Sequence, residues 1–301
     1  MAFIFWVVRG YGSRSQHHRE RSHQREYIRP SRHWIFSHLW CCSYRNIAHT
    51  AFYMLAAYCI YIVTHKMGFH PLWGMVIAIC LVTLLGLISY KVFINPIREH
   101  EGAVLIATIA LAMAFQEIMA IIFTGTYLSV PSLVKGYLMI LGVKVFYQQL
   151  LTFCVALLVM VGLWVLLLRT KLGLAIRSTA QDREVANLMG INEARVAMMT
   201  MGISVGLAAL TGAVVVPLTI LEPHMWMHPL IMMMAVVVLG GLGSLKGSFL
   251  GAYILGFAEA LVVFLAPMGS FLKGSVALSV MILVLLIRPE GLFGVSFEEE
   301  R

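Results

Sequence analysis

Charged residues are scarce in this sequence. Only 12% of its 301 residues are Asp, Glu, Lys or Arg, whereas 60% are hydrophobic. About a quarter of the residues in a typical soluble domain are charged, and a chain this apolar has too few polar groups to cover its own surface in water. The composition therefore excludes a soluble globular protein and predicts a chain that uses the lipid bilayer as its solvent.

The sequence also lacks the residue patterns of a metal centre or an enzyme. His49, near the start of an apolar run, is the lone catalytic candidate, and no partner for it is evident, which argues against an intramembrane enzyme. We therefore expect no catalytic residue, metal or cofactor in this chain. Cysteine is scarce. The five cysteines form neither a zinc-binding spacing nor a secreted disulfide framework. They are Cys41, Cys42, Cys59, Cys80 and Cys154.

A phosphate-binding loop is absent, although one stretch is rich in glycine. That loop requires Gly, Lys and Ser or Thr in this order, whereas here Lys246 precedes Gly247. We expect Gly240, Gly241 and Gly243 to form a tight turn and close helix contacts instead.

Positive charge is concentrated at the start of the chain. Residues 1–46 contain eight Arg, no Lys and two Glu, although the whole chain has a formal net charge of +8. This distribution does not suit a nucleic-acid-binding fold. We interpret residues 1–46 as an atypical basic segment, disordered or out of frame, with a basic arm on anionic lipid as the alternative. A membrane domain is expected over 47–294 and a charged tail over 295–301.

Long apolar runs begin at residue 47. A helix that crosses a bilayer needs about 20 apolar residues, so we expect an all-α, polytopic bundle of about eight spans. The expected spans are 47–65, 70–92, 102–124, 148–169, 197–221, 230–245, 248–267 and 275–288. The sixth span is short and ends among glycines, which is typical of a broken or re-entrant helix.

Basic residues in the short loops predict the orientation of the spans. Lys and Arg accumulate in loop 170–196, and Arg98 lies in loop 92–101. Because two spans separate these loops, both are expected on the same side of the membrane, which should be the cytoplasm. Segment 125–147 is then expected outside.

The loop 170–196 is long enough to contain a helix of its own. Ala180 to Met189 is amphipathic, with Ser178 and Thr179 as candidates for the N-cap and Gly190 as the expected stop. Such a helix, held between two spans, could dock another protein and transmit force into the bundle. A solvated connector is the alternative.

Small and polar residues within the spans predict helix contacts and a polar route. Gly202 and Gly206 form a GxxxG pair, which allows two helices to approach closely. Glu117 continues a stripe of alanines and is expected to point into the bundle beside Gln116. A carboxylate at this depth costs roughly 2.5–3.5 kcal/mol on insertion scales, so Glu117 and Glu259 are candidates for a pathway lining or a proton site, or for structural hydrogen bonds. The stripe consists of Ala103, Ala107, Ala110 and Ala114.

Several short motifs, taken in order, resemble one known family. They are Asn95-Pro96-Ile97-Arg98, Val130-Pro131, Arg169 to Arg177, Ala186, Gly190-Ile191-Asn192, Val238 to Ser244, and Arg288 to Gly294. Over about residues 46–294 the chain is similar to the LivH-type permeases of branched-chain amino acid ABC importers. It departs from the family near Asn46, where an Arg-, His- and Ser-rich stretch replaces the usual first helix.

The resemblance implies a role and a set of partners. It implies a permease that pairs with a second, LivM-type permease, with two cytoplasmic ATPase subunits and an extracytoplasmic binding protein, in the bacterial inner membrane. ATP would bind to the partner chains. The ABC coupling helix carries Glu-Ala-Ala followed by Gly, which Glu184, Ala186 and Gly190 match and Val185 does not. The coupling role is carried over to these three residues and to the flanking Arg177.

Two alternatives and the identity of the solute remain open at this point. One alternative is a stand-alone ion- or proton-coupled carrier with Glu117 and Glu259 as proton sites, although no clear internal repeat of the kind such carriers show is present. The other is a purely structural membrane subunit. Similar permeases serve branched-chain amino acids, other amino acids, urea and short amides.

Overall fold

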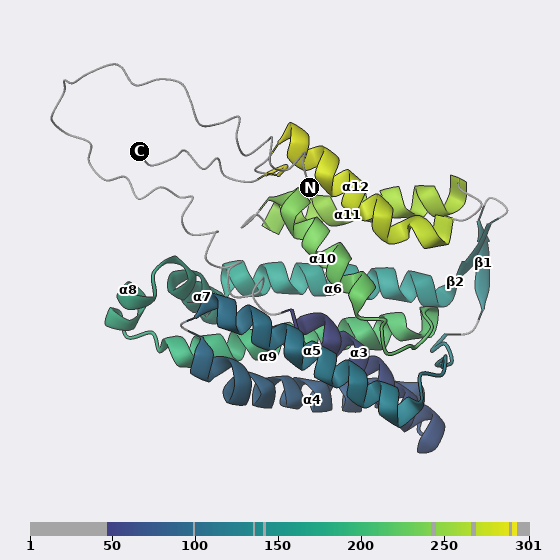
Figure 1. Ribbon diagram of the computed structural model, residues 1–301, viewed down its shortest axis with the longest axis horizontal. Helices are drawn as coiled ribbons and strands as arrows, with labels where there is room; N and C mark the ends of the chain where they lie inside the picture. Colours follow the sequence, from purple (N-terminus) through teal and green to yellow (C-terminus); the bar gives the residue numbers. More distant parts are fainter. Residues whose placement is uncertain are drawn as a thin grey trace, which may run out of the picture. The chain divides into compact units, whose positions relative to one another are not determined.

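The described part of the chain consists mainly of long helices (Figure 1). The computed structural model describes residues 47–98, 100–134, 136–140, 143–241, 245–265, 269–288 and 291–293. The segment 1–46, Gly243 and the tail 295–301, for which predictions were made, lie outside the described residues. The long helices are α3 (His49–Tyr61), α4 (Pro71–Ser89), α5 (Glu101–Phe123), α6 (Tyr147–Arg169), α9 (Glu193–Val215), α10 (Met227–Gly240), α11 (Leu245–Leu265) and α12 (Gly269–Ile287).

A helix overlaps each of the eight predicted spans, and five of these helices are long and apolar enough to cross a membrane. The five segments are Pro71–Ile97, Gly102–Phe123, Tyr147–Arg169, Glu193–Leu218 and Gly247–Leu265. The apolar helices Met227–Gly240 and Gly274–Ile287 are shorter. A multi-pass membrane protein is therefore supported, and the count of eight spans stays a prediction.

Helix α3 forms the centre of the first group of helices. It packs against α4, α5 and α9, and ten of its 13 residues are buried. Because neighbours surround it on several sides, its apolar residues do not follow a single stripe. Small residues allow the close approach: a side chain at Gly212 of α9 would meet the carbonyl oxygen of Tyr53 at 2.5 Å.

Helices α4 and α9 meet through glycine. A Cβ atom added at Gly86 would come within 2.6 Å of the Val205 side chain, so the two backbones approach each other closely. Gly202 and Gly206, the predicted GxxxG pair, lie on the same contact, opposite Leu87 and Thr83. Small residues at such contacts let van der Waals packing hold helices together in lipid.

Helices α10, α11 and α12 form a second group with its own small core, made by Ala235, Leu239, Leu255 and Ala277. At its edge, a side chain at Gly240 would collide with the backbone of Gly247 at the start of α11. Gly241 follows with a positive φ of 93°, which glycine adopts readily. The close contact expected of this run is present at Gly240, and Gly241 ends α10, while the turn expected at Gly243 lies outside the described residues.

The end of α10 is capped by residues from far along the chain. The amide of Leu292 donates to the carbonyl of Leu239 at 2.8 Å, and the amide of Phe293 donates to that of Gly240 at 3.2 Å. The last carbonyls of a helix have no partner within the helix. Two of the motifs that carried the family resemblance therefore meet in space, and amides of the later motif donate hydrogen bonds to carbonyls of the earlier one.

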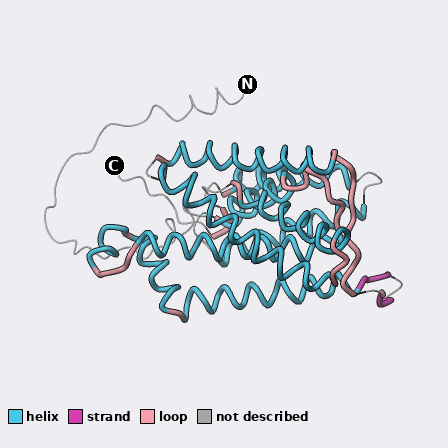
Figure 2. The backbone as a smooth tube through the Cα atoms, turned by 90° about the horizontal axis from the view of Figure 1, so that it is seen from below, coloured by secondary structure: helices cyan, strands magenta, loops and turns pink. Residues whose placement is uncertain are grey.

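A short hairpin departs from the all-α prediction. Strands β1 (Tyr137–Ile140) and β2 (Val143–Phe146) pair antiparallel, with Tyr137 opposite Phe146. Their β-branched and aromatic residues favour extended structure. Both views show the hairpin at one end of α6 and the segment 170–192 at the other (Figures 1 and 2), and we refer to these as the hairpin end and the coupling end.

Candidate functional site

The predicted coupling helix is divided into two helices. Helix α7 (Lys171–Gln181) and helix α8 (Arg183–Leu188) are separated by Asp182. The Asp182 carboxylate accepts hydrogen bonds from the amides of Glu184 at 2.9 Å and Val185 at 3.0 Å, and thereby caps α8. The prediction that Ser178 or Thr179 caps the helix is wrong, because both lie inside α7, where the backbone amides are already bonded.

Helix α7 is fixed against the end of α6. A side chain at Gly173 would collide with the carbonyl oxygens of Leu166 and Leu167, so glycine is required there. Ile176 packs in a small apolar core with Leu167 and with Val196 of α9. Arg177, predicted to flank the coupling element, extends along α7 and donates from Nε to the carbonyl of Gly173 at 3.3 Å.

Helix α8 exposes most of its surface. Ala186 is its one buried residue, and the carbonyl of Ala186 accepts from the amide of Ile191 at 3.0 Å. Glu184 is exposed. Gly190 ends the turn with a φ of 84°, which fits its predicted role as a stop. The apolar tip of α8 is held out from the bundle: Leu188 is 86% exposed and Met189 is 78% exposed.

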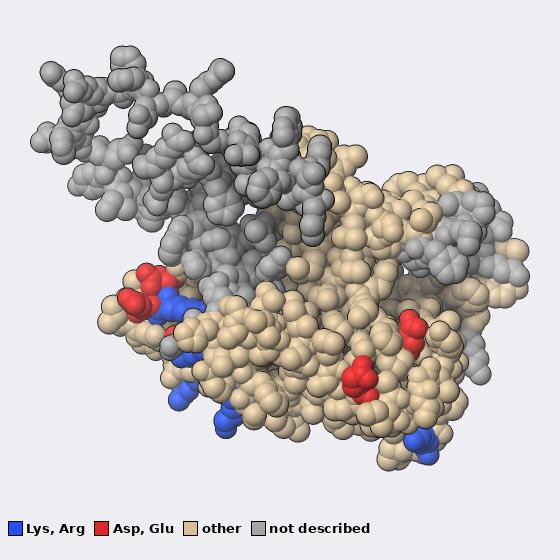
Figure 3. All heavy atoms as spheres, in the orientation of Figure 1, with Lys and Arg blue, Asp and Glu red and all other residues tan. Residues whose placement is uncertain are grey.

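Ion pairs join this element to the loop after α4. The Glu193 carboxylate, in the first turn of α9, lies 3.4 Å from Arg183 and 3.7 Å from Arg98. The prediction that loops 92–101 and 170–196 lie on the same side is therefore confirmed. Figure 3 shows charged side chains gathered at this end and few of them over the rest of the described surface. Glu193 was not singled out from the sequence, because a carboxylate in a helix's first turn is common.

A second polar cluster lies nearer the hairpin end. Gln116 of α5 is only 5% exposed. Its Oε1 accepts from Nε1 of Trp226 at 2.8 Å, its Nε2 donates to the Glu117 carboxylate at 3.1 Å, and the same Nε2 lies 3.3 Å from Nε2 of His224. The amide of Gln116 therefore connects the segment before α10 to the Glu117 side chain.

The prediction that Glu117 points into the bundle is wrong for this chain. Glu117 is exposed, as are Ala110 and Ala114 of the predicted stripe. Helix α5 instead turns another face inward. That buried face consists of Val104, Thr108, Ala112 and Gln116. The two faces have similar spacing and small residues, so periodicity alone did not separate them.

Two further candidates have defined neighbours. The Glu259 carboxylate of α11 lies 3.1 Å from Nε2 of His228, at the start of α10. Nδ1 of His49 lies 3.5 Å from the Ser204 hydroxyl, which joins α3 to α9. His224, Trp226 and His228 were missed from the sequence. Two histidines four residues apart beside an apolar run were the available signal, since that spacing places them on one face of a helix.

Gln148 anchors the hairpin end to α9. Its Oε1 accepts from the amide of Leu133 at 3.2 Å, and its Nε2 donates to the carbonyl of Val214 at 3.1 Å. The Thr152 hydroxyl reaches the same carbonyl at 3.3 Å. This buried residue was also missed, because a glutamine at the start of a span is usually solvated.

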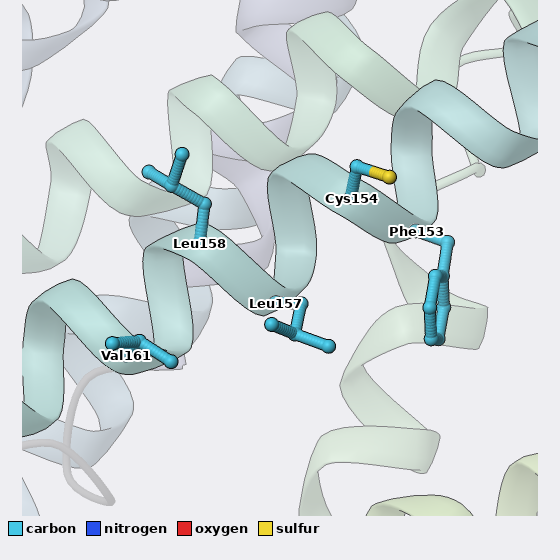
Figure 4. A pocket seen from close by; sticks show the side chains of 5 residues that line it. All are labelled: Phe153, Cys154, Leu157, Leu158 and Val161. Carbon is cyan, nitrogen blue, oxygen red and sulfur yellow. The ribbon is translucent and has the colours of Figure 1, made fainter.

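An apolar groove of about 420 Å³ runs along α6 (Figure 4). Phe153, Cys154, Leu157, Leu158 and Val161 line it. No charged, hydroxyl or amide side chain lines the groove, so it offers nothing to orient a charged solute. Among the residues that the structure describes, no group of three or more His, Cys, Asp or Glu side chains could hold a metal ion.

Comparison with known proteins agrees with this arrangement. The family described as "Branched-chain amino acid transport system / permease component" matches residues 42–287. The permease protein BraD of the high-affinity branched-chain amino acid transport system of Pseudomonas aeruginosa is 31% identical over 83% of this chain and 85% of its own length.

Two further relatives have the same kind of name. The corresponding permease protein LivH of Escherichia coli is 28% identical with the same coverage. A probable LivH of Methanocaldococcus jannaschii is 26% identical over 84% of each chain. No solved structure matches. The chain belongs to the family of branched-chain amino acid transport system permease components.

Proposed function

We propose that this chain is the membrane-spanning permease subunit of an ABC importer for branched-chain amino acids or related small solutes such as urea and short amides. The relatives are permease proteins of branched-chain amino acid transport systems. The observation that carries the ABC mechanism is the coupling end. There α7 is fixed to α6 while α8 presents exposed Leu188 and Met189, as a docking element for another subunit would.

The partners follow from this assignment. Two cytoplasmic ATPase subunits would bind α8, a second, LivM-type permease would complete the pathway, and an extracytoplasmic binding protein would deliver the solute. ATP would bind and be hydrolysed in the partner chains. The complex would lie in the bacterial inner membrane, with the coupling end in the cytoplasm.

The geometry suggests how force would enter the bundle. Displacement of α8 would act on α6 through Gly173 and the core around Ile176, and on α9 through the buried Ala186. Glu193 would extend the effect to the loop after α4 through Arg98. Nucleotide binding would thereby bias the bundle between inward-open and outward-open arrangements, as in other two-state transporters.

The test is uptake by the reconstituted complex. The chain is co-purified with its ATPases, second permease and binding protein, placed in proteoliposomes, and assayed with radiolabelled leucine and urea. We expect ATP-dependent uptake that requires the binding protein. A proton-driven uptake by this chain alone would contradict the proposal. That stand-alone carrier, the earlier alternative, has no support from the relatives.

A further inference from the structure

The hairpin of β1 and β2 has two faces of different chemistry. Successive residues of a strand lie on opposite faces, and the register pairs Tyr137 with Phe146 and Leu138 with Val145. The positions therefore separate into an aliphatic face and an aromatic face. The aliphatic face consists of Leu138, Ile140, Val143 and Val145, and the aromatic face consists of Tyr137, Met139, Lys144 and Phe146. The two strands contain one basic residue and no acidic residue.

The described part of the chain leaves much of both faces exposed. Leu138, on the aliphatic face, is 48% exposed, and Met139, on the aromatic face, is 65% exposed. A two-stranded hairpin alone in water is marginally stable at best. Exposed apolar patches of this kind mark contacts with a membrane or with another protein. The aliphatic face therefore has room for a partner.

The base of the hairpin is fixed to the helices. The amide of Tyr147 donates to the carbonyl of Gly136 at 3.2 Å, and a Cβ atom added at Gly136 would come within 2.8 Å of the Tyr147 ring. Gln148 connects Leu133, just before the hairpin, to the Val214 carbonyl of α9. Because these contacts hold both ends of the hairpin, its level relative to α6 is set.

That level is the edge of the hydrocarbon core. Helix α6 begins at Tyr147, directly after β2, and has 23 residues. At 1.5 Å per residue it is about 35 Å long, slightly longer than the hydrocarbon core of about 30 Å. The strands run across the direction of α6 at its end (Figure 1). One face of the hairpin can therefore lie toward the acyl chains, while its open strand edges reach water and headgroups, as unpaired backbone groups require.

Exposed aromatic side chains mark the same level on other helices. Trp73, near the start of α4, and Tyr127, just after α5, are both exposed. Both belong to the hairpin end, because Arg98, which lies between α4 and α5, is paired with Glu193 at the coupling end. Tryptophan and tyrosine are enriched where a membrane meets water. The aromatic residues of the hairpin continue this belt.

We propose that the hairpin is an interfacial anchor: its aliphatic face lies against the acyl chains of the leaflet at the hairpin end, and its aromatic face lies among the phospholipid headgroups. The surface continues the apolar surface of α6, where Leu150 is exposed. Lys144 complements anionic headgroups in charge. A soluble protein fits less well, since protein interfaces carry about one hydrogen bond per 100–200 Å², and the aliphatic face has no hydrogen-bonding side chain. This lipid contact goes beyond the proposed transport function and does not depend on the solute.

The test is depth-dependent fluorescence quenching. The full chain, with its five cysteines replaced by Ala and purified with its partner subunits, is reconstituted into vesicles of phosphatidylcholine and phosphatidylglycerol. Leu138→Cys or Met139→Cys carries the fluorophore NBD. Because an interfacial segment buries its apolar face about 5–10 Å deep, lipid with a doxyl group on carbon 5 should quench NBD at Leu138 at least about twofold more than at Met139. NBD at Glu184→Cys, on exposed α8, is the control and should show water-like emission and little quenching.

Each other outcome overturns the proposal. Water-like emission at both hairpin positions would show that the hairpin stands in water. A blue shift that appears only after addition of the loaded binding protein would assign the surface to that protein. A blue shift that the doxyl lipid does not quench would show that another subunit covers it. Equal quenching at Leu138 and Met139 would refute the assignment of the two faces.

The second strand keeps the test decisive if a label on the first strand distorts the hairpin. Val145 lies opposite Leu138 on the aliphatic face, and Lys144 lies opposite Met139 on the aromatic face. NBD at Val145→Cys should therefore be quenched at least about twofold more than NBD at Lys144→Cys, for the same reason of depth. Quenching at Val145 that is no stronger than at Lys144 would overturn the proposal.

Discussion

At the coupling end, Glu193 lies between two arginines, whereas at the hairpin end the described polar partners of Glu117 and Glu259 are a glutamine and a histidine. Both regions place carboxylates among apolar helices, and both connect helices that are distant in sequence. The first region neutralises its acid with permanent cations, which fixes two loops to each other. In the second region, no Lys or Arg of the described residues pairs with either acid, and Gln116 and His228 contact them instead. The same kind of side chain thus forms a link between permanent charges in one place and contacts with an amide and an imidazole in the other.

The largest expected effect concerns the apolar tip of α8, where Leu188 is 86% exposed. Leu188→Asp should weaken binding of the ATPase subunits by about 30-fold, since an apolar anchor at the centre of an interface is worth roughly 2 kcal/mol. The measurement is co-purification and titration of the ATPase onto the permease. Leu188→Met is the matched control and should bind normally. Unchanged affinity of the Asp variant would remove α8 from the interface.

The turn after α8 should transmit force. Gly190 has a positive φ of 84° and open space around it. Gly190→Val should therefore strain the backbone rather than clash, and uptake per ATP hydrolysed should fall by about tenfold. Gly190→Asn, which tolerates this conformation, should stay within about twofold of the wild type. Normal coupling in the Val variant would refute the role of this turn.

The hairpin end depends on a neutral hydrogen bond where the coupling end uses ion pairs. Gln148→Leu would leave the amide of Leu133 without its partner, and the Val214 carbonyl would keep only Thr152. We expect a loss of about 1 kcal/mol in the free energy of unfolding, at the low end for a buried unsatisfied group. Thermal unfolding in detergent measures it. Gln149→Leu, at an exposed position, should shift the midpoint less, and an equal shift would contradict the assignment.

The smallest expected effect concerns the ion pairs themselves. Arg98 and Glu193 are partly exposed at 35% and 17%, and their atoms are 3.7 Å apart. A double-mutant cycle with Arg98→Ala and Glu193→Ala should give a coupling energy below about 1 kcal/mol, which decreases with salt. Uptake per ATP in the same variants tests whether the link carries motion. Additive effects in both measurements would show that the link is only a surface contact.

The positions of the helices along the chain were predictable from the sequence, but the face that each helix buries was not. Apolar runs located every long helix, because length and hydropathy are properties of the segment itself. The inward face of α5 was predicted wrongly, since the alanine stripe ending at Glu117 and the buried stripe ending at Gln116 differ by one residue. Which stripe is buried depends on the position of α3, and that position is set by tertiary packing.

Local chemistry explains the other differences. Asp182 divides the predicted helix because its carboxylate accepts hydrogen bonds from the two amides that follow Arg183. In the sequence, Ser178 is a competing candidate for the same N-cap role. The hairpin at 137–146 was not predicted, because two four-residue strands are too short for a periodic signal. Glu193, Gln148 and His228 acquire their roles from residues more than 30 positions away or on other helices, which no local pattern encodes.

The contact between Leu292 and Leu239 sets an order for biogenesis. A growing chain places α10 in the membrane long before the residues that satisfy its last two carbonyls have been synthesised. Until the ribosome has passed Phe293, those carbonyls remain open to water, lipid headgroups or a chaperone. A product truncated after α12 would carry every helix that the structure describes and still lack this closure. The end of α10 is therefore closed last, after every described helix has been synthesised.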